Sequence, residues 1–261
     1  MAEKFSNAVG YERQLGPWSS ALAPRFIEFA DVQQGERVLD VGSGTGSLTL
    51  ALAASIACSE VVGIDPSEPY IEFARKRTSD PRVRFDVGDA KSLPYADNYF
   101  DKVLSQLVLN QVRDAPRAVQ EMARVNKPGG IIAACVWTAG KENERNHLFW
   151  EAAIAVDPAA EQKRETEGGY GLKGRLAALW TQCGLKQIAE CDLMCSVEFT
   201  RFDEFWLPHL EGQAHSGSYV KSLPSNLRDA LRDRLRQDIL GTKPDGRFSI
   251  SAKSLAVRGI P

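Results

Sequence analysis

The feature that most constrains this chain is a regular alternation of strand-like and helix-like segments between residues 37 and 137. Short apolar runs typical of buried strands lie at 37–42, 60–65, 82–90, 100–106 and 129–137. Helical patterns lie between them at 46–56, 66–78 and 114–126, with Ser67 and Asp114 placed to cap the second and third. Because strand–helix–strand units return to one sheet by right-handed crossovers, the alternation predicts an α/β fold with a doubly wound parallel sheet.

The pattern changes on both sides of this stretch. Residues 1–35 read as a helical lead-in, 138–172 are polar with scattered aromatics, and 200–245 are mostly helical. The remaining segments predict a helix at 174–184 and two further strands at 186–199 and 247–259.

Composition excludes several classes of function. A formal charge of -2, from 32 basic and 34 acidic residues, disfavours nucleic-acid binding. No apolar run reaches the roughly 18 residues of a membrane span, and the polar start predicts a cytoplasmic protein. Five scattered cysteines without a C-x-x-C motif predict neither a disulfide framework nor a metal site.

Three glycines alternate directly after the first strand, at Gly42, Gly44 and Gly46. Glycine lets the backbone turn tightly and approach a ligand, while the N-terminus of the next helix favours a carboxylate or other anion. Asp65 ends the second strand, where a carboxylate can accept hydrogen bonds from both hydroxyls of a ribose, and Asp89 follows the third, within reach of an adenine amino group. We therefore expect an adenosine-binding crevice at the carboxyl edge of the sheet.

The details of the loop indicate which adenosine ligand it suits. Dinucleotide sites prefer G-x-G-x-x-G/A, whereas this loop reads G-x-G-x-G and carries Ser47 at the last small position. Asp40, at the end of the first strand, would repel a pyrophosphate and attract an ammonium or a sulfonium. Both features favour a ligand without a diphosphate, and an NAD(P)-dependent oxidoreductase stays as the alternative.

Together these residues resemble the class I S-adenosylmethionine-dependent methyltransferases. VLDVGSGTG matches their first motif, VVGID the acid of the second strand, GDAKSLPYADNYFDKV the next two strands, and EMARVNKPGG the helix and turn before the fifth. Within the class, the chain is similar to the type 11 small-molecule group, which includes ubiquinone and menaquinone C-methyltransferases. The resemblance implies a Rossmann-like, seven-stranded sheet with an antiparallel last strand, and S-adenosyl-L-methionine as the cofactor.

The resemblance also implies that one methyltransferase domain over 1–261 has a cofactor-binding part and an acceptor-binding part. Residues 36–137 would bind the cofactor, and 1–35, 138–172 and 200–245 would form the lid and the acceptor pocket. The implied cofactor-binding residues are Asp40, Gly42, Ser43, Gly44 and Gly46 at its amino-acid end, Asp65 at the ribose, Pro66, Asp89 and Ala90 at the adenine, and Ser105 and Gln106 near the methionine part.

The catalytic residues are harder to identify, because transfer from a sulfonium needs alignment and no acid. A base is needed only if the acceptor must lose a proton, and the candidates are His147, His209 and His215. Aromatic side chains that could wall off a small-molecule acceptor are Tyr11, Trp18, Tyr170, Trp206 and Tyr219. A catalytically silent, cofactor-binding regulator stays as a further alternative. The acceptor, the atom methylated and the oligomeric state cannot be read from the sequence.

Overall fold

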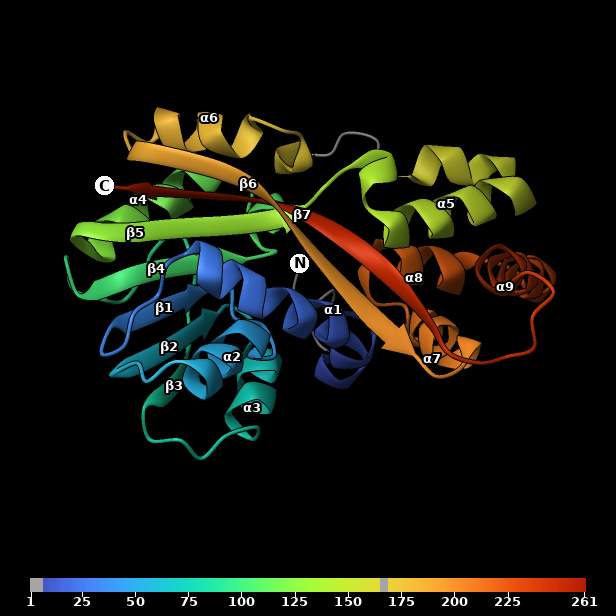
Figure 1. Ribbon diagram of the computed structural model, residues 1–261, viewed down its shortest axis with the longest axis horizontal. Helices are drawn as coiled ribbons and strands as arrows, with labels where there is room; N and C mark the ends of the chain where they lie inside the picture. The colour runs from blue at the N-terminus through green and yellow to red at the C-terminus, as the bar shows by residue number, and fades with distance from the viewer. Residues whose placement is uncertain (1–6, 165–168) are drawn as a thin grey trace.

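A computed structural model describes residues 7–164 and 169–261 of the chain. Its sheet has seven strands in the order β3-β2-β1-β4-β5-β7-β6 (Figure 1). The strands are β1 (Arg37–Val41), β2 (Glu60–Asp65), β3 (Val83–Val87), β4 (Phe100–Gln106), β5 (Asn126–Trp137), β6 (Lys186–Phe199) and β7 (Phe248–Ile260). Strands β1 to β5 pair in parallel, and β7 is antiparallel to both β5 and β6. The predicted seven-stranded α/β fold with an antiparallel last strand is confirmed.

Helices cover both faces of this sheet, because successive strand residues point to opposite sides. Val38 packs into the apolar cluster under α1 and α2, whereas Leu39 packs into the cluster under α4 and α6. The helices are α1 (Ala8–Phe29), α2 (Ser47–Ser55), α3 (Glu68–Arg75), α4 (Ala115–Val125) and α6 (Arg175–Gln182). Figure 1 shows α4 and α6 over one face and α2 and α3 over the other.

Both predicted helix caps are present. The Ser67 side chain accepts a hydrogen bond from the backbone N–H of Tyr70, and the Asp114 side chain accepts one from that of Arg117. Each cap satisfies a donor that the first turn of a helix leaves free, which fixes where α3 and α4 begin.

A helical cap is built on the far halves of the last two strands (Figure 1). Strand β5 pairs with β7 only from Ser254 to Gly259, so β6 and β7 continue together beyond the parallel sheet. The helices gathered there are α5 (Glu144–Val156), α7 (Phe202–Trp206), α8 (Ala214–Ser222) and α9 (Ser225–Leu240). Short 3₁₀ turns complete the connections: η2 (Leu109–Gln111), η3 (Gly140–Glu142), η4 (Pro158–Lys163), η5 (Gly169–Gly171) and η6 (Leu207–Glu211).

Several predicted elements differ from the structure, among them the ends of two strands and one helix. Strand β3 ends at Val87 rather than at 90, because the chain turns at Asp89, whose backbone bridges to Ser92. Strand β5 begins at Asn126 rather than at 129, since Asn126 pairs with Phe100 before an irregularity in the register. Helix α5 lies within 138–172, where only a polar segment with scattered aromatics was expected. Residues 1–6 and 165–168 of the predicted lid segments lie outside the described residues.

No helix within the described ranges is long and apolar enough to cross a membrane.

Candidate cofactor and acceptor site

The glycine loop connects β1 to α2 in a conformation that requires glycine. Gly42, Gly44 and Gly46 have φ angles of 80°, 54° and 93°, in the left-handed region that other residues avoid. Gly42 is also tightly enclosed, since a Cβ added there would lie 2.4 Å from a methyl carbon of Val108. The loop therefore has little room for any side chain at Gly42.

Asp40 lies beneath this loop and is almost completely buried. Its Oδ2 accepts hydrogen bonds from the backbone N–H of Thr49, at 3.1 Å, and from the Thr49 hydroxyl, at 2.7 Å. Burial raises the pKa of Asp40 to about 7, against the opposing effect of the Thr49 hydrogen bonds. Asp40 thus holds the first turn of α2 under the loop, a contact that the sequence analysis did not anticipate.

Asp65 connects the end of β2 to the same loop. Its Oδ2 accepts a hydrogen bond from the backbone N–H of Gly44 at 3.0 Å, and its Oδ1 accepts one from that of Ser67 at 2.9 Å. Burial raises the pKa of this carboxyl, while the two backbone hydrogen bonds lower it. Each carboxylate oxygen has a second lone pair, so Asp65 can still accept hydrogen bonds from ligand hydroxyls.

Two buried oxygens near the loop have no hydrogen-bond donor among the described residues: Ser43 Oγ and Gln106 Oε1. The other end of the Gln106 amide donates to the backbone carbonyl of Ser19 at 3.0 Å, which fixes the side chain. Beside it, the Ser105 hydroxyl donates to the carbonyl of Val41 at 2.9 Å and joins β4 to β1. Buried polar atoms are nearly always paired in folded proteins, so these two oxygens suit a polar ligand.

The predicted adenine-side residues lie on the loops that follow β2 and β3. Pro66 and Asp89 are exposed, and Ala90 packs partly against the apolar cluster under α4. The Asp89 carboxylate accepts a hydrogen bond from the backbone N–H of Lys91 at 2.9 Å, and Lys91 Nζ lies 3.4 Å from it.

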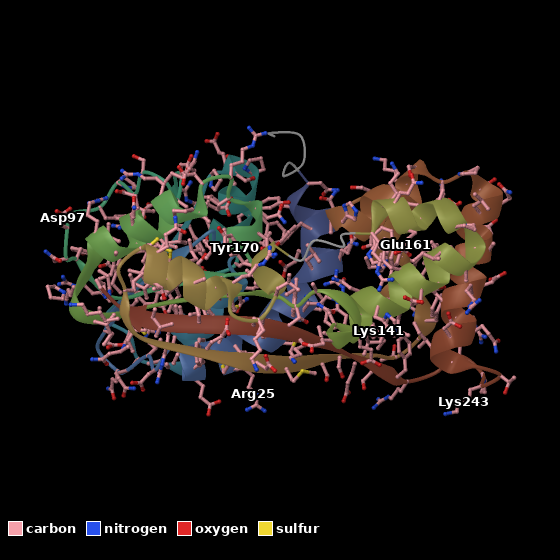
Figure 2. All side chains as sticks on the ribbon, turned by 90° about the horizontal axis from the view of Figure 1, so that it is seen from above. Arg25, Asp97, Lys141, Glu161, Tyr170 and Lys243 are labelled. Atoms are coloured by element: carbon pink, nitrogen blue, oxygen red, sulfur yellow. The ribbon has the colours of Figure 1, made fainter. Side chains whose placement is uncertain are left out.

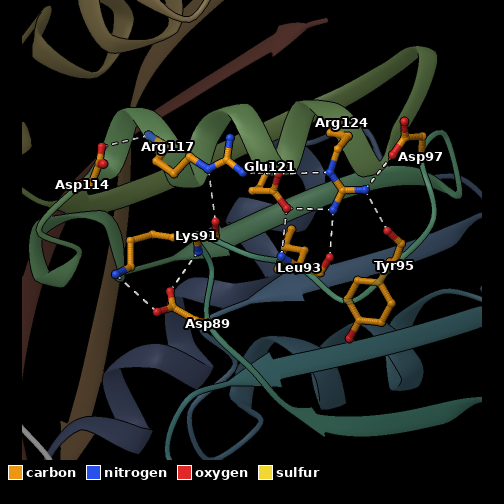
Figure 3. Close-up of polar contacts among 9 residues, drawn as sticks. All are labelled: Asp89, Lys91, Leu93, Tyr95, Asp97, Asp114, Arg117, Glu121 and Arg124. Carbon is orange, nitrogen blue, oxygen red and sulfur yellow. Dashed lines mark hydrogen bonds and ion pairs between the residues drawn. The ribbon is translucent and has the colours of Figure 1, made fainter.

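A polar clamp, formed by Arg117, Glu121 and Arg124, fastens the loop after β3 to α4 (Figure 3). The buried Glu121 accepts a hydrogen bond from the backbone N–H of Leu93 at 2.9 Å and forms ion pairs with both arginines. Arg124 also donates to the backbone carbonyls of Leu93 and Tyr95, at 2.8 Å each. The Arg124 hydrogen bond is the main cause that lowers the pKa of Glu121. The clamp was not predicted, although its acid and two arginines lie at helical spacing in the sequence.

The first turns of α1 lie over the glycine loop. The centres of the Tyr11 and Tyr70 rings are 5.0 Å apart, and Tyr11 Cε1 would lie 3.9 Å from a Cβ added at Gly44. The next residue, Glu12, accepts a hydrogen bond from the Thr45 hydroxyl at 2.6 Å and lies 3.0 Å from Arg77. Burial, with Asp65 and Glu12 adding to it, raises the pKa of Tyr11 to about 12.

A cavity of about 210 Å³ opens between α1, the end of β6 and the α5, α7 and η6 segments, and we call it the cap cavity. It is lined by Arg13, Gln14, Pro17, Trp18, Arg145, Val197, Glu198, Phe199, Glu204, Phe205, Pro208 and His209. Two of the residues singled out from the sequence, Trp18 and His209, are among them. Arg145 and Gln14 were not anticipated.

The other predicted pocket aromatics lie elsewhere. Trp206 and Tyr219 are buried in the apolar cluster of α1 and the cap, and the Tyr219 hydroxyl is 3.3 Å from an Asp157 oxygen. Tyr170 packs with the cluster on the opposite face of the sheet, and its backbone N–H donates to Asn110 at 3.0 Å. Figure 2 shows Tyr170 over the sheet, apart from the cap that carries Lys141 and Glu161.

The three candidate histidines occupy different surroundings. His209 is buried and its ring stacks on Phe149 with 5.2 Å between the centres. Burial lowers the pKa of His209 to about 4, so the ring is neutral at pH 7 and a weak base. His147 lies 3.5 Å from Glu151 and His215 contacts the Lys163 carbonyl, and neither residue lines the cap cavity.

Comparison with known proteins matches part of this chain to a family. Residues 39–134 match the family described as a methyltransferase domain, of type 11. Demethylmenaquinone methyltransferase of Staphylococcus aureus (strain JH9) is 36% identical over 139 residues, which are 52% of this chain and 55% of that protein. The chain thus spans about half the length of the curated relatives that it matches.

Solved structures share the fold at lower identity. YcgJ of Bacillus subtilis aligns with a TM-score of 0.56 at 20% identity, over 91% of this chain and 97% of that one. Phosphoethanolamine N-methyltransferase 2 of Haemonchus contortus, solved in complex with S-adenosyl-L-methionine, gives 0.57 at 18%, over 97% and 56%. The [4+2]-cyclase SpnF gives 0.55 at 21%, over 93% and 81%.

The matched residues, 39–134, carry the glycine loop, Asp65 and the clamp, on the seven-stranded sheet that the motifs predicted. Residues 39–134 therefore match the methyltransferase-domain family of type 11, and the fold around them is shared with the solved structures named above.

Proposed function

We propose that this protein transfers a methyl group from S-adenosyl-L-methionine to a small-molecule acceptor. The observation that supports this most directly is the position of Asp65, whose carboxylate lies 3.0 Å from the backbone nitrogen of Gly44 in the glycine loop. An acid at the end of β2, held against a glycine turn that opens a helix, suits a ribose next to an amino-acid group.

The residues around the glycine loop fit such a cofactor. Asp65 would accept the ribose hydroxyls, and Pro66, Asp89 and Ala90 would border the adenine. Asp40 and the loop from Gly42 to Gly46 would surround the amino-acid end. The buried Ser43 Oγ and Gln106 Oε1, which have no donor among the described residues, would find one in the ligand's ammonium group. Ser105 would position this end through its hydrogen bond to Val41.

When bound, the cofactor supplies an electrophilic methyl group on a sulfonium, so the carbon–sulfur bond breaks as the bond to the acceptor forms. The protein's part is to align the acceptor with that group and to exclude water. Tyr11, over the glycine loop, and Trp18, two turns further along α1, are placed for both tasks. His209 is the candidate base that lines the cap cavity, and its low pKa suits it only to acceptors that give up a proton readily.

The same proposal divides the single domain over 1–261 into two parts. Residues 36–137 bind the cofactor, while 1–35, 138–172 and 200–245 contribute α1 and the cap helices around the acceptor. A cytoplasmic location stays a prediction.

Calorimetric titration with S-adenosylhomocysteine tests the cofactor. We expect binding by the wild type and affinity at least about tenfold weaker in Asp65→Ala, because the ribose loses its acceptors. Asp233→Ala is the control, since Asp233 is exposed on α9. No binding at millimolar ligand, or equal affinity in Asp65→Ala, would contradict the proposal.

Two alternatives give different results in the same protein. Tighter binding of NADH or NADPH than of S-adenosylhomocysteine would indicate an oxidoreductase. Cofactor binding without methyl transfer to any member of a cell-metabolite extract, with labelled donor and mass spectrometry, would indicate a silent regulator or another reaction. The fold alone does not separate these outcomes, because the cyclase SpnF shares it.

A further inference from the structure

The cap cavity contains a buried positive charge that none of the described residues neutralises. Arg145, the second residue of α5, is 6% exposed and lines this cavity. It forms no ion pair or hydrogen bond with any residue in 7–164 or 169–261. Its guanidinium carbon lies 5.1 Å from the centre of the Trp18 ring, a cation–π contact without counter-charge.

The charge is unfavourable where it stands. Burial lowers the pKa of Arg145 to about 10, which still leaves the guanidinium charged at pH 7. Because Arg145 lies in the first turn of α5, the positive end of the helix dipole opposes it. A buried charge with no partner costs several kcal/mol in general, so such a residue indicates that a ligand supplies the missing anion.

No carboxylate among the described residues lies within ion-pair distance of Arg145, and its nearest titratable neighbours are uncharged. Tyr11 and Cys195 are near enough to affect its pKa, but burial raises their own pKa values to about 12 and about 11, so both are protonated at pH 7. His209 is neutral for the reason given above. At the rim of the cavity, Glu204 is held by the backbone N–H and the hydroxyl of Thr200, at 2.7 and 2.5 Å.

The rest of the cavity is suited to an apolar molecule with one polar end. Trp18, Phe199, Phe205 and Pro208 contribute apolar walls. The buried amide of Gln14 also lines the cavity, and its Oε1 has no donor among the described residues. A pocket with aromatic walls and a few polar groups is the usual form of a small-molecule site.

Helix α1 extends from this cavity to the residues that we assign to the cofactor. Tyr11, Gln14 and Trp18 are three and four residues apart, so they share one face of the helix. The pKa of the Tyr11 hydroxyl is raised by the charge of Asp65 and lowered by that of Arg145, so both residues lie within electrostatic range of it. A molecule in the cap cavity would therefore lie next to the site that we assign to the methyl donor.

From these observations we propose that the acceptor is a small carboxylate with an aromatic or aliphatic body, bound by an ion pair with Arg145. This inference rests on the proposed function, and it adds the chemical class of the acceptor. The guanidinium forms two parallel hydrogen bonds to a carboxylate, while Trp18 and Phe199 pack against the body. A carboxylate is favoured over a phosphate monoester, because one guanidinium balances one charge and the Glu198 and Glu204 carboxylates at the rim oppose a second.

The test uses the full chain saturated with S-adenosylhomocysteine, with 3-phenylpropanoate as the probe and 3-phenylpropanamide as its neutral match. Binding is followed by calorimetry and ligand-observed NMR. We expect the carboxylate to bind at least about tenfold more tightly than the amide, and Arg145→Met to remove this preference. Arg145→Lys should restore part of it, because the charge returns without the planar fork. Arg25→Met is the control, since Arg25 is exposed on the far part of α1 (Figure 2).

Each contrary result has its own meaning. Equal binding of acid and amide, no binding of the acid by the wild type, or an unchanged preference in Arg145→Met would overturn the inference and leave the proposed function standing. Tighter binding of phenyl phosphate than of the carboxylate would overturn the choice of anion. A tenfold loss of S-adenosylhomocysteine affinity in a folded Arg145→Met would assign the arginine to the cofactor's own carboxylate instead. Failure of the wild type to bind S-adenosylhomocysteine would refute the proposed function itself, and the probes are then titrated without it.

Discussion

The Glu121 carboxylate accepts a hydrogen bond from the backbone N–H of Leu93 at 2.9 Å, which ties α4 to the loop after β3. In Glu121→Gln, the NH₂ group of the amide would face N–H donors of Arg117 and Arg124. Both ion pairs would also be lost, because the side chain is neutral. We expect a loss of about 1–3 kcal/mol in the free energy of unfolding, measured by urea denaturation. Glu72→Gln, an exposed change on α3, should stay close to the wild type. A Glu121→Gln protein as stable as that control would show that the clamp contributes nothing.

Gly42 allows a prediction that separates backbone strain from steric contact. Gly42 and Gly35 have φ angles of 80° and 84°, but a Cβ meets Val108 at 2.4 Å in the first and nothing within 4 Å in the second. Gly35→Ala should therefore cost only the strain of the left-handed region, about 1–2 kcal/mol, and Gly42→Ala about 1–3 kcal/mol more. In the Val108→Ala background, Gly42→Ala should lose most of its extra cost over Gly35→Ala, because the contacting methyl groups are gone. Equal losses in the two alanine variants would argue against the close contact.

The buried Asp40 predicts how stability depends on pH. Since the pKa of Asp40 is raised to about 7, the folded protein binds this proton more tightly than the unfolded chain. The stability that this proton binding adds to the folded state is fully present below about pH 4 and is lost as the pH rises through 7. Asp40→Asn carries no titrating group at this position. The difference between its free energy of unfolding and that of the wild type should therefore shift in favour of the variant by up to a few kcal/mol between pH 5 and pH 8. If the free energies of unfolding of the two proteins change in parallel across this pH interval, the prediction is contradicted. Asp233→Asn serves as the control for unrelated charge effects.

Glu12 fastens the start of α1 over the glycine loop through Thr45 and Arg77. Glu12→Ala removes both contacts, so backbone amides in the first turns of α1 should exchange with deuterium about tenfold faster or more. Glu28→Ala, at an exposed position near the end of the same helix, is the control. Unchanged exchange in Glu12→Ala would mean that packing around Tyr11 alone holds the helix in place.

Much of the fold follows from local pattern, and particular strands show why. Strands β2 and β6 begin and end at the predicted residues, because apolar runs bounded by turn residues are strong local signals. Helix α5 was missed, since its first turn carries charged residues and its apolar ones include the aromatics Phe149 and Trp150, which do not favour a helix by themselves. What buries them is the cap, which forms only when β6, β7 and α9 are in place.

The candidate site divides in the same way. Gly42, Asp65 and Asp89 could be proposed because each lies at the end of a strand or directly after one. Arg145 could not, since a charged residue within KENERNH reads as solvent-exposed. Its isolation depends on Trp18, from a helix more than a hundred residues earlier, and on Cys195, from a strand that comes later.

Helix α1 has one further consequence. Its Tyr11 end contacts the loop beside Asp65, and its Trp18 end forms a wall of the cavity that holds Arg145. We therefore expect a substitution that loosens either end of the helix to change the rate at which a ligand leaves the other compartment.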